Sequence, residues 1–190
     1  MKIKEAKELV QEAIHIKSCV LDFPLKYQAH ISSVSYNIYE VAKKLNKKGY
    51  EISPEEMEGV GYLHDIGRCF GSSYRHNVDF HEYVGARLLN VMGYSEEADI
   101  IKRHGFSFEK SELLTEKDLE GNVLNPFELL PTNLDAMLLC YIDDSVDSSG
   151  QKCRWEDRLN NCRGKYQKID IENGITRLAK MYKNIEEMLK

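Results

Sequence analysis

Apolar residues recur at helical spacing along most of the chain. Near the N-terminus, one apolar face consists of Ile3, Ala6, Leu9, Val10, Ala13 and Ile14. Within residues 25–47, a second face consists of Ile31, Val34, Ile38, Val41, Ala42 and Leu45. In residues 171–189, a third consists of Ile171, Ile175, Leu178, Tyr182, Ile185 and Leu189. Because positions three and four residues apart share one side of an α-helix, this pattern predicts an all-α fold.

Capping residues indicate where several of these helices begin. Ser53 can cap a helix whose first residue is Pro54, and Glu56 stands where a capping box requires it. We expect this helix to run to about Asp65 and to end near Gly67. Further helices are expected at about 80–92, 95–104 and 155–163.

Two further helices also have recognisable starts. Thr132, with Asp135 three residues later, is expected to begin a helix that runs through Asp143, and Asp170 is expected to cap the C-terminal helix. Residues 106–131 show little period. We interpret this segment as a long, partly ordered insertion of the kind that often forms a lid.

The composition excludes several classes of protein. A chain of 190 residues is expected to form one domain, here residues 1–190. Its 31 acidic and 26 basic side chains give a formal net charge of -5, which disfavours a nucleic-acid partner. A local pocket can still bind a small anion. No apolar run is long enough to cross a bilayer, so no membrane partner is expected.

The cysteines and the first residues suggest a compartment. Five cysteines are scattered without a C-x-x-C pair: Cys19, Cys69, Cys140, Cys153 and Cys162. The charged N-terminal residues contain no apolar core of a secretory signal. We therefore expect a reduced, cytoplasmic protein in which the cysteines are small buried apolar residues.

His64 and Asp65 carry the main chemical signal. They follow an apolar segment, residues 60–63, and precede Gly67. Adjacent helical side chains normally point about 100° apart, but at a helix end both can reach one ion beyond the last turn. An imidazole and a carboxylate together suit Fe, Mn, Co, Ni or Zn.

Other residues share this position against an apolar helical segment: His30, His81, His104 and Asp143. A carboxylate at the end of an apolar run needs a partner, because burying it unpaired is expensive, and a metal would satisfy Asp143. Any one of these histidines alone is more often a cap, so the prediction rests on the joint pattern. His15 and His76 lack this setting and are interpreted as surface residues.

The order H…HD…H…H…D resembles that of the HD-domain superfamily of metal-dependent phosphohydrolases. Residues 61–68, GYLHDIGR, resemble its GLLHDIGK segment, and residues 81–89 resemble its H…GA.LL helix. Residues 101–105 resemble its I..HH or I..HG segment, and residues 139–143 its L..AD segment. The resemblance covers about residues 25–165. It implies a single-domain helical bundle of the HD type, with terminal helices at about 2–18 and 171–189 packed on this core.

The resemblance also implies a set of metal ligands. One ion would be held by His30, His64, Asp65 and Asp143. His81 and His104 are the extra pair of the two-metal branch, in which Asp65 bridges the ions. The family usually has Ala before its final Asp, and here Ile142 stands there, so Asp144 is an alternative to Asp143 and Asp147 a more distant one. The expected cofactor is one or two divalent ions of Fe, Mn, Co, Ni or Zn, with Mg as a further candidate.

The implied reaction cleaves a phosphate ester or anhydride of a nucleotide or related small molecule by metal-activated water. Asp65, His81 and His104 are the expected catalytic residues; with one ion bound, His81 or His104 could serve as a general acid. Arg68 is the first choice to bind phosphate oxygens, followed by Lys102 and Arg103, and then by Arg75. Trp155 is assigned to packing.

Two other functions fit the same resemblance. One is a non-catalytic, regulatory HD module, and the other is a di-iron oxygenase on the same fold. The complete set of metal-type side chains argues against a module that only binds, because a scaffold does not need them. Both a monomer and a homo-oligomer are compatible with the sequence.

Overall fold

The computed structural model describes residues 1–18, 25–70, 80–113, 125–163 and 169–190. The α-helices in them are α1 (Ile3–Ser18), α2 (Leu25–Lys47), α3 (Pro54–Leu63), α4 (His81–Val91), α5 (Ser95–Ile101), α6 (Ser107–Lys110), α7 (Leu134–Asp143), α8 (Trp155–Cys162) and α9 (Ile171–Leu189). Short 3₁₀ helices are η1 (Ile66–Phe70), η2 (Ser111–Leu113) and η3 (Pro126–Leu129). Within these ranges the strand pairing is one isolated bridge, between Val146 and Lys152. The predicted all-α fold is confirmed.

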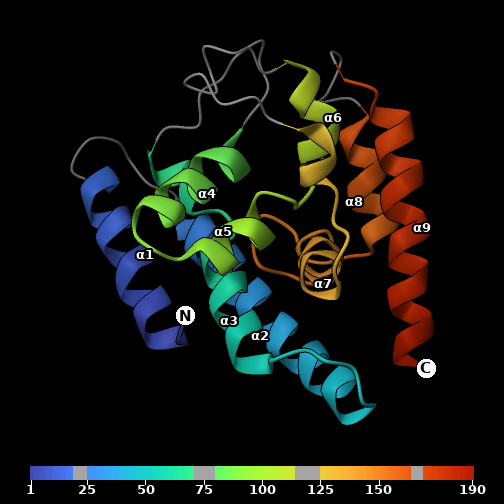
Figure 1. Cartoon of the computed structure of the whole chain (residues 1–190), viewed down its shortest axis with the longest axis horizontal. Helices are drawn as coiled ribbons and strands as arrows, with labels where there is room; N and C mark the ends of the chain where they lie inside the picture. Colours follow the sequence, from blue (N-terminus) through green and yellow to red (C-terminus); the bar gives the residue numbers. More distant parts are fainter. Residues whose placement is uncertain (19–24, 71–79, 114–124, 164–168) are drawn as a thin grey trace.

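Helices α2, α3 and α7 lie between the two terminal helices. Figure 1 shows α1 on one side of the molecule and α9 on the other. Helix α3 packs against both α1 and α2, and α9 packs against α7 and α8. In the described part of the chain, no helix is long and apolar enough to cross a membrane.

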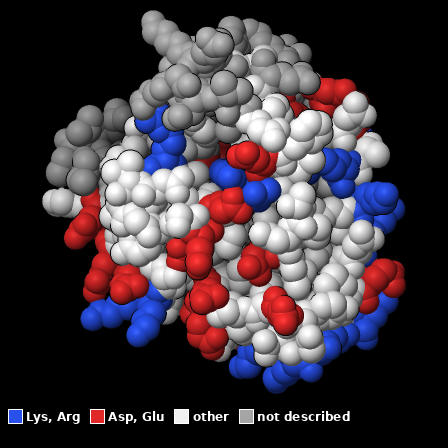
Figure 2. Space-filling model, in the orientation of Figure 1, with Lys and Arg blue, Asp and Glu red and all other residues white. Residues whose placement is uncertain are grey.

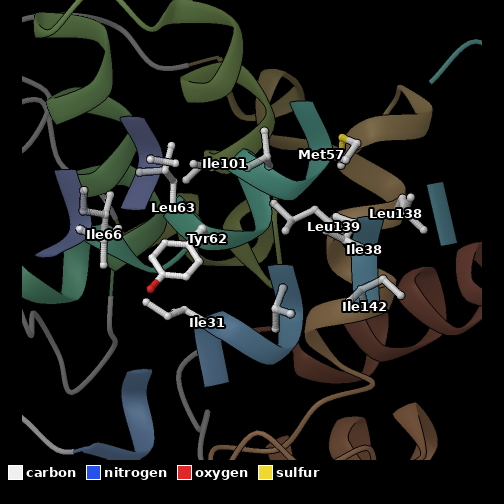
Figure 3. Close-up of a cluster of buried hydrophobic side chains, with 14 of the residues drawn as sticks. Ile31, Ile38, Met57, Tyr62, Leu63, Ile66, Ile101, Leu138, Leu139 and Ile142 are labelled. Atoms are coloured by element: carbon white, nitrogen blue, oxygen red, sulfur yellow. The ribbon is translucent and has the colours of Figure 1, made fainter. Parts of the chain in front are cut away.

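The core fills the space between these helices. Figure 3 shows its central side chains, among them Ile31 and Ile38 from α2, Leu63 from α3, and Leu139 from α7. Each of these four is fully buried. Burying one such side chain contributes about 1.5–3 kcal/mol, so this cluster supplies much of the free energy that orders the helix ends.

Two of the predicted helix starts are confirmed, and one is wrong. The Ser53 hydroxyl accepts a hydrogen bond from the Glu56 amide at 3.3 Å, and the Asp170 carboxylate accepts one from the Asn173 amide at 3.2 Å. Helix α7, however, is capped by Asn133 rather than by Thr132. The Asn133 side chain accepts from the Ala136 amide at 2.9 Å from an extended backbone. Asn is the stronger cap, which explains the shift by one residue.

The end of α3 also differs from the prediction. The helix ends at Leu63, not at about Asp65, and the chain turns directly into η1. A Cβ atom at position 67 would lie 2.0 Å from the main-chain oxygen of His81. Only glycine allows this close approach, which brings the turn after α3 against the start of α4.

The segment 106–131 is more regular at its two ends than expected. Helix α6 and the 3₁₀ helices η2 and η3 occupy its described parts, and Lys110 is buried. Residues 114–124 lie outside the described residues, as do Arg75, His76 and Cys19.

The packing assignment of Trp155 agrees with the structure, and the expected burial of the cysteines agrees for three of the five. Trp155 is buried, with its ring 5.5 Å from that of Tyr182 in an edge-to-face arrangement, as the packing role requires. Cys69, Cys140 and Cys162 are buried, whereas Cys153 is half-buried.

Candidate metal centre

Ligand-type side chains from five parts of the chain meet inside the bundle. They are His30 from α2, His64 and Asp65 from the turn after α3, His81 at the first position of α4, His104 just after α5, and Asp143 at the last position of α7. Five of the six stand next to a core residue in sequence, and His104 follows the core residue Ile101 by three positions. Figure 3 shows five of these core neighbours in the apolar cluster: Ile31, Leu63, Ile66, Ile101 and Ile142. The core thus fixes the backbone on which the polar side chains are mounted.

Asp65 lies at the centre of the cluster. Its Oδ1 atom is 2.7 Å from Nε2 of His81 and 3.9 Å from Nε2 of His104, and its Oδ2 atom is 3.8 Å from Nε2 of His64. Two triads have ligand atoms within 4.8 Å of one another: His30, His64 and Asp65 form one, and Asp65, His81 and His104 form the other. Asp65 belongs to both, as a bridging ligand would.

Asp143 joins the first triad. Its Oδ1 atom is 3.1 Å from Nε2 of His30 and 3.5 Å from Nε2 of His64. The carboxylate of Asp144 points elsewhere and accepts a hydrogen bond from the Tyr182 hydroxyl at 2.5 Å. Asp147 contributes its main-chain oxygen, which lies 2.9 Å from Nδ1 of His30. Of the three candidate aspartates, the structure therefore brings the Asp143 carboxylate to the histidines.

Main-chain carbonyls fix the orientation of three histidine rings. Nδ1 of His30 faces the oxygen of Asp147, Nδ1 of His64 faces that of Gly61 at 2.8 Å, and Nδ1 of His104 faces that of Ile101 at 2.6 Å. A carbonyl can only accept, so Nδ1 carries the proton in each ring and the Nε2 lone pair is directed into the cluster.

This arrangement fits a metal ion. The buried Nε2 atom of His64 makes no hydrogen bond to the described residues. A buried polar atom without a partner is costly, and a divalent ion accepting its lone pair would remove that cost. The donor set of imidazoles and carboxylates is the one that first-row transition metals prefer.

His81 is held differently. Its Nδ1 atom is 3.5 Å from the Glu82 carboxylate, and its Nε2 atom is 3.2 Å from both Nε2 of His104 and Nη2 of Arg68. Burial and the Arg68 charge oppose protonation of His81, but the carboxylates of Glu82 and Asp65 raise its pKa to about 9. Burial and the neighbouring His81 lower the pKa of His104 to about 4. Adjacent imidazoles therefore differ strongly in proton affinity.

The carboxylates of the centre are held in their charged form. Burial acts to raise the pKa of Asp65, but the Arg68 guanidinium and His81 hold it well below its ordinary value. Burial likewise opposes ionisation of Asp143, and the neighbouring His30 and His64 hold its pKa well below the ordinary value. Ionised carboxylates are the form that a metal ion needs.

The predicted phosphate-binding cations lie in two places. Arg68 is at the centre, with Nε 2.7 Å from Oδ2 of Asp65, and its side chain is 37% exposed. Lys102 and Arg103 instead pair with Asp99, at 2.8 and 2.9 Å. The structure therefore brings only Arg68, of these three, to the ligand cluster.

Sequence reasoning missed the residues that support the ligands. Glu82 and Lys110 form a buried ion pair beside His81. Glu82 follows a predicted ligand directly, so its position in the first turn of α4 was the available signal. Lys110 offered none, because the fold alone brings it to Glu82.

A cleft with acidic walls lies apart from this centre. This cleft of about 380 Å³ has its walls on α3 and α5 and includes Glu56, Glu96, Glu97, Asp99 and Asp135. Figure 2 shows acidic side chains running down the middle of this face, over the region that α3 and α5 occupy in Figure 1. None of the ligand residues lines the cleft. The candidate chemistry therefore belongs to the buried cluster, not to this surface.

Comparison with known proteins gives one relative. The chain is 34% identical over 119 residues to a protein of Methanocaldococcus jannaschii described as uncharacterized. The match covers 62% of this chain and 64% of that protein, so the chain spans less than two thirds of its relative's length. No protein-family model and no solved structure matches the chain. A buried His/Asp cluster inside an all-helical fold is compatible with the HD-domain arrangement.

Proposed function

We propose that the protein is a metal-dependent phosphohydrolase of the HD-domain type. Its substrate would be a phosphate ester or anhydride of a nucleotide or a related small molecule. One observation carries the proposal: three buried histidines direct Nε2 lone pairs at the ionised carboxylates of Asp65 and Asp143. Without a cation, the buried Nε2 atom of His64 makes no hydrogen bond to the described residues.

The residues divide into two ion-binding groups around Asp65. His30, His64, Asp65 and Asp143 would hold the first ion, and Asp65, His81 and His104 the second. Bound ions supply a water of lowered pKa and positive charge for phosphoryl oxygens. The motif order H…HD…H…H…D supports the same grouping.

Of the predicted phosphate-binding cations in the described residues, Arg68 lies at the site. Its guanidinium contacts Asp65 and remains partly exposed, so it can turn one face to the ligands and another to an entering phosphate. A guanidinium binds phosphate oxygens through two parallel N–H donors, which orients the group as well as neutralising it. Because the chain carries a net charge of -5, this local positive charge is needed to hold an anion.

Metal analysis followed by a substrate screen tests the proposal. Protein purified without chelators is expected to contain one or two transition-metal ions per chain, measured by mass spectrometry. With Mn²⁺, Co²⁺, Ni²⁺ or Fe²⁺ it is expected to release phosphate from a member of a nucleotide panel. His15→Ala, an exposed site, serves as the control that retains both properties.

Other results would select the alternatives. Bound metal with oxygen consumption and no phosphate release would indicate the di-iron oxygenase. Bound nucleotide with neither reaction would indicate a regulatory module. A wild-type chain that binds no transition metal would exclude both the hydrolase and the oxygenase.

A further inference from the structure

A buried ion pair stands directly behind one of the ligand histidines. Glu82 is 3% exposed and Lys110 is 2% exposed. The Lys110 ammonium contacts Oε1 of Glu82, while Oε2 lies 3.5 Å from Nδ1 of His81. Two charges are rarely buried so deeply in a bundle of this size, because removing them from water is expensive. Their position suggests a role at the centre.

His81 differs from the other ligand histidines in what its outer nitrogen meets. His30, His64 and His104 each present Nδ1 to a main-chain oxygen at 2.6–2.9 Å, whereas Nδ1 of His81 has the Glu82 carboxylate at 3.5 Å, an ion-pair distance longer than a normal hydrogen bond. A carboxylate behind a histidine fixes the tautomer, orients the ring and makes Nε2 a stronger donor to a metal. Glu82 is therefore placed to do for His81 what the backbone does for the others.

Helix α6 connects to both histidines of the second group. The Ser107 hydroxyl donates to the main-chain oxygen of His104 at 2.8 Å, and Lys110 reaches His81 through Glu82. The same helix is tied to α9, because Glu109 pairs with Arg177 at 2.8 Å. A short helix that would be marginal alone is thus held in place beside the second group.

We propose that Glu82 is a positioning residue that holds His81 as a ligand of the second ion, and that Lys110 fixes Glu82 in that position. This inference rests on the metal centre of the proposed function and adds a residue pair that acts through His81. It predicts that the two ions depend differently on Glu82. The second ion should need it, and the first should not.

The test is a titration of the metal-free chain with Co²⁺. Binding is measured by calorimetry and by the visible absorption of the bound ion. Glu82→Gln keeps the shape but removes the charge. It is expected to weaken the second Co²⁺ by about 10–100-fold and to leave the first within about twofold. Glu109→Gln is the matched control. It removes the charge of a similarly buried glutamate on the same helix as Lys110, in an ion pair with the partly exposed Arg177 that does not touch a ligand histidine.

A second variant separates positioning from folding. Lys110→Met leaves the Glu82 charge without its partner and is expected to lower the midpoint of thermal unfolding. In the double variant Glu82→Gln, Lys110→Met, neither charge of the buried pair remains. The midpoint of thermal unfolding should then recover while the second Co²⁺ stays weakly bound. Recovery of the affinity together with the midpoint would assign the pair a purely structural role.

The remaining outcomes are distinguishable. Equal Co²⁺ affinities in Glu82→Gln and the wild type would overturn the inference and leave the proposed function standing. Equal weakening of both ions would also overturn it, as would a wild type that binds a single Co²⁺. A wild type that binds no Co²⁺ would instead refute the metal centre itself.

Discussion

The two halves of the cluster share Asp65 but hold their histidines by different means. His30 and His64 each present Nδ1 to a main-chain carbonyl, so the backbone of the neighbouring turns sets their orientation. In the second half, His104 likewise faces a main-chain carbonyl, but His81 has the Glu82 carboxylate 3.5 Å from Nδ1. A carbonyl stays in place when side chains change, whereas a buried carboxylate needs a partner of its own. The backbone therefore orients both histidines of the first half, whereas one of the two in the second half, His81, depends on side-chain charge.

The charges also differ between the halves. Asp143 adds a second carboxylate to the first half, between His30 and His64. The Arg68 guanidinium lies 2.7 Å from Oδ2 of Asp65, the oxygen that faces His64, and 3.2 Å from Nε2 of His81, so its charge opposes a cation in either half. Because of its second carboxylate, we expect the first half to bind its ion more tightly.

The largest effect should come from the residue that the halves share. Asp65→Ala is expected to abolish binding of both ions and all phosphatase activity, since each triad loses its carboxylate. Circular dichroism should show that the helices remain, because Leu63 and Ile66 still anchor the turn in the core. Normal metal content in this variant would mean that the centre lies elsewhere.

Substitutions of Asp143 and Asp144 test which of the two aspartates is a ligand of the first ion. Asp143→Ala should weaken the first ion by more than the roughly 100-fold that supporting residues contribute, because a direct ligand is lost. Asp144→Ala should leave metal content unchanged and reduce the free energy of unfolding by about 1–3 kcal/mol, because a buried hydrogen bond to Tyr182 is lost. Denaturant titration and metal analysis measure both. The reverse result would make Asp144 the ligand.

These ligands were predictable from the sequence because each lies beside an apolar helical segment. His30 precedes Ile31, and Asp143 follows Ile142, so the core that buries the isoleucine also brings in its polar neighbour. The carbonyls behind the histidines carry no side-chain signal. The oxygen that meets His30 belongs to Asp147, far along the chain, and a short loop places it there.

The predicted cations show where proximity in sequence misleads. Lys102 and Arg103 flank His104, which suggested a role at the site. On a helix, however, residues three and four positions apart face each other. Asp99 precedes Lys102 by three positions and Arg103 by four, so it pairs with both. Arg68 follows Asp65 by three residues in the 3₁₀ turn, where positions i and i+3 lie one above the other, and this places it on the carboxylate.

Arg68 and Lys102 can be compared directly. Arg68→Ala is expected to lower kcat/KM by about 10–100-fold, since a charge-assisted contact to phosphate contributes about 1.5–3 kcal/mol. It should not weaken the second ion, because a competing cation is removed from Asp65. Lys102→Ala should have the smaller effect, because its ammonium is engaged by Asp99. Steady-state kinetics with saturating metal measures both. A larger loss of kcat/KM in Lys102→Ala than in Arg68→Ala would indicate that Lys102 binds the phosphate.

The loop after α7 supports His30 in the first half, as Glu82 supports His81 in the second. The Asp147 carboxylate accepts hydrogen bonds from the amides of Ser149 and Gln151, at 2.8 and 3.0 Å, and this turn aims the main-chain oxygen of Asp147 at His30. Asp147→Ala should loosen the turn and weaken the first Co²⁺ by about tenfold, leaving the second ion nearly unchanged. Asp147→Asn, which keeps an acceptor, should largely restore it.

Together, Asp147→Ala and Glu82→Gln separate the two modes of support. If backbone and side-chain support act independently, each variant weakens only its own ion. In the double variant, each ion is then weakened by the same factor as in the corresponding single variant. If both ions instead respond to either change, Asp65 transmits the disturbance from one half to the other. Its Oδ1 atom faces His81 and its Oδ2 atom faces His64, so a rotation of this one carboxylate would alter both contacts at once. Calorimetric titration of the four proteins distinguishes these cases.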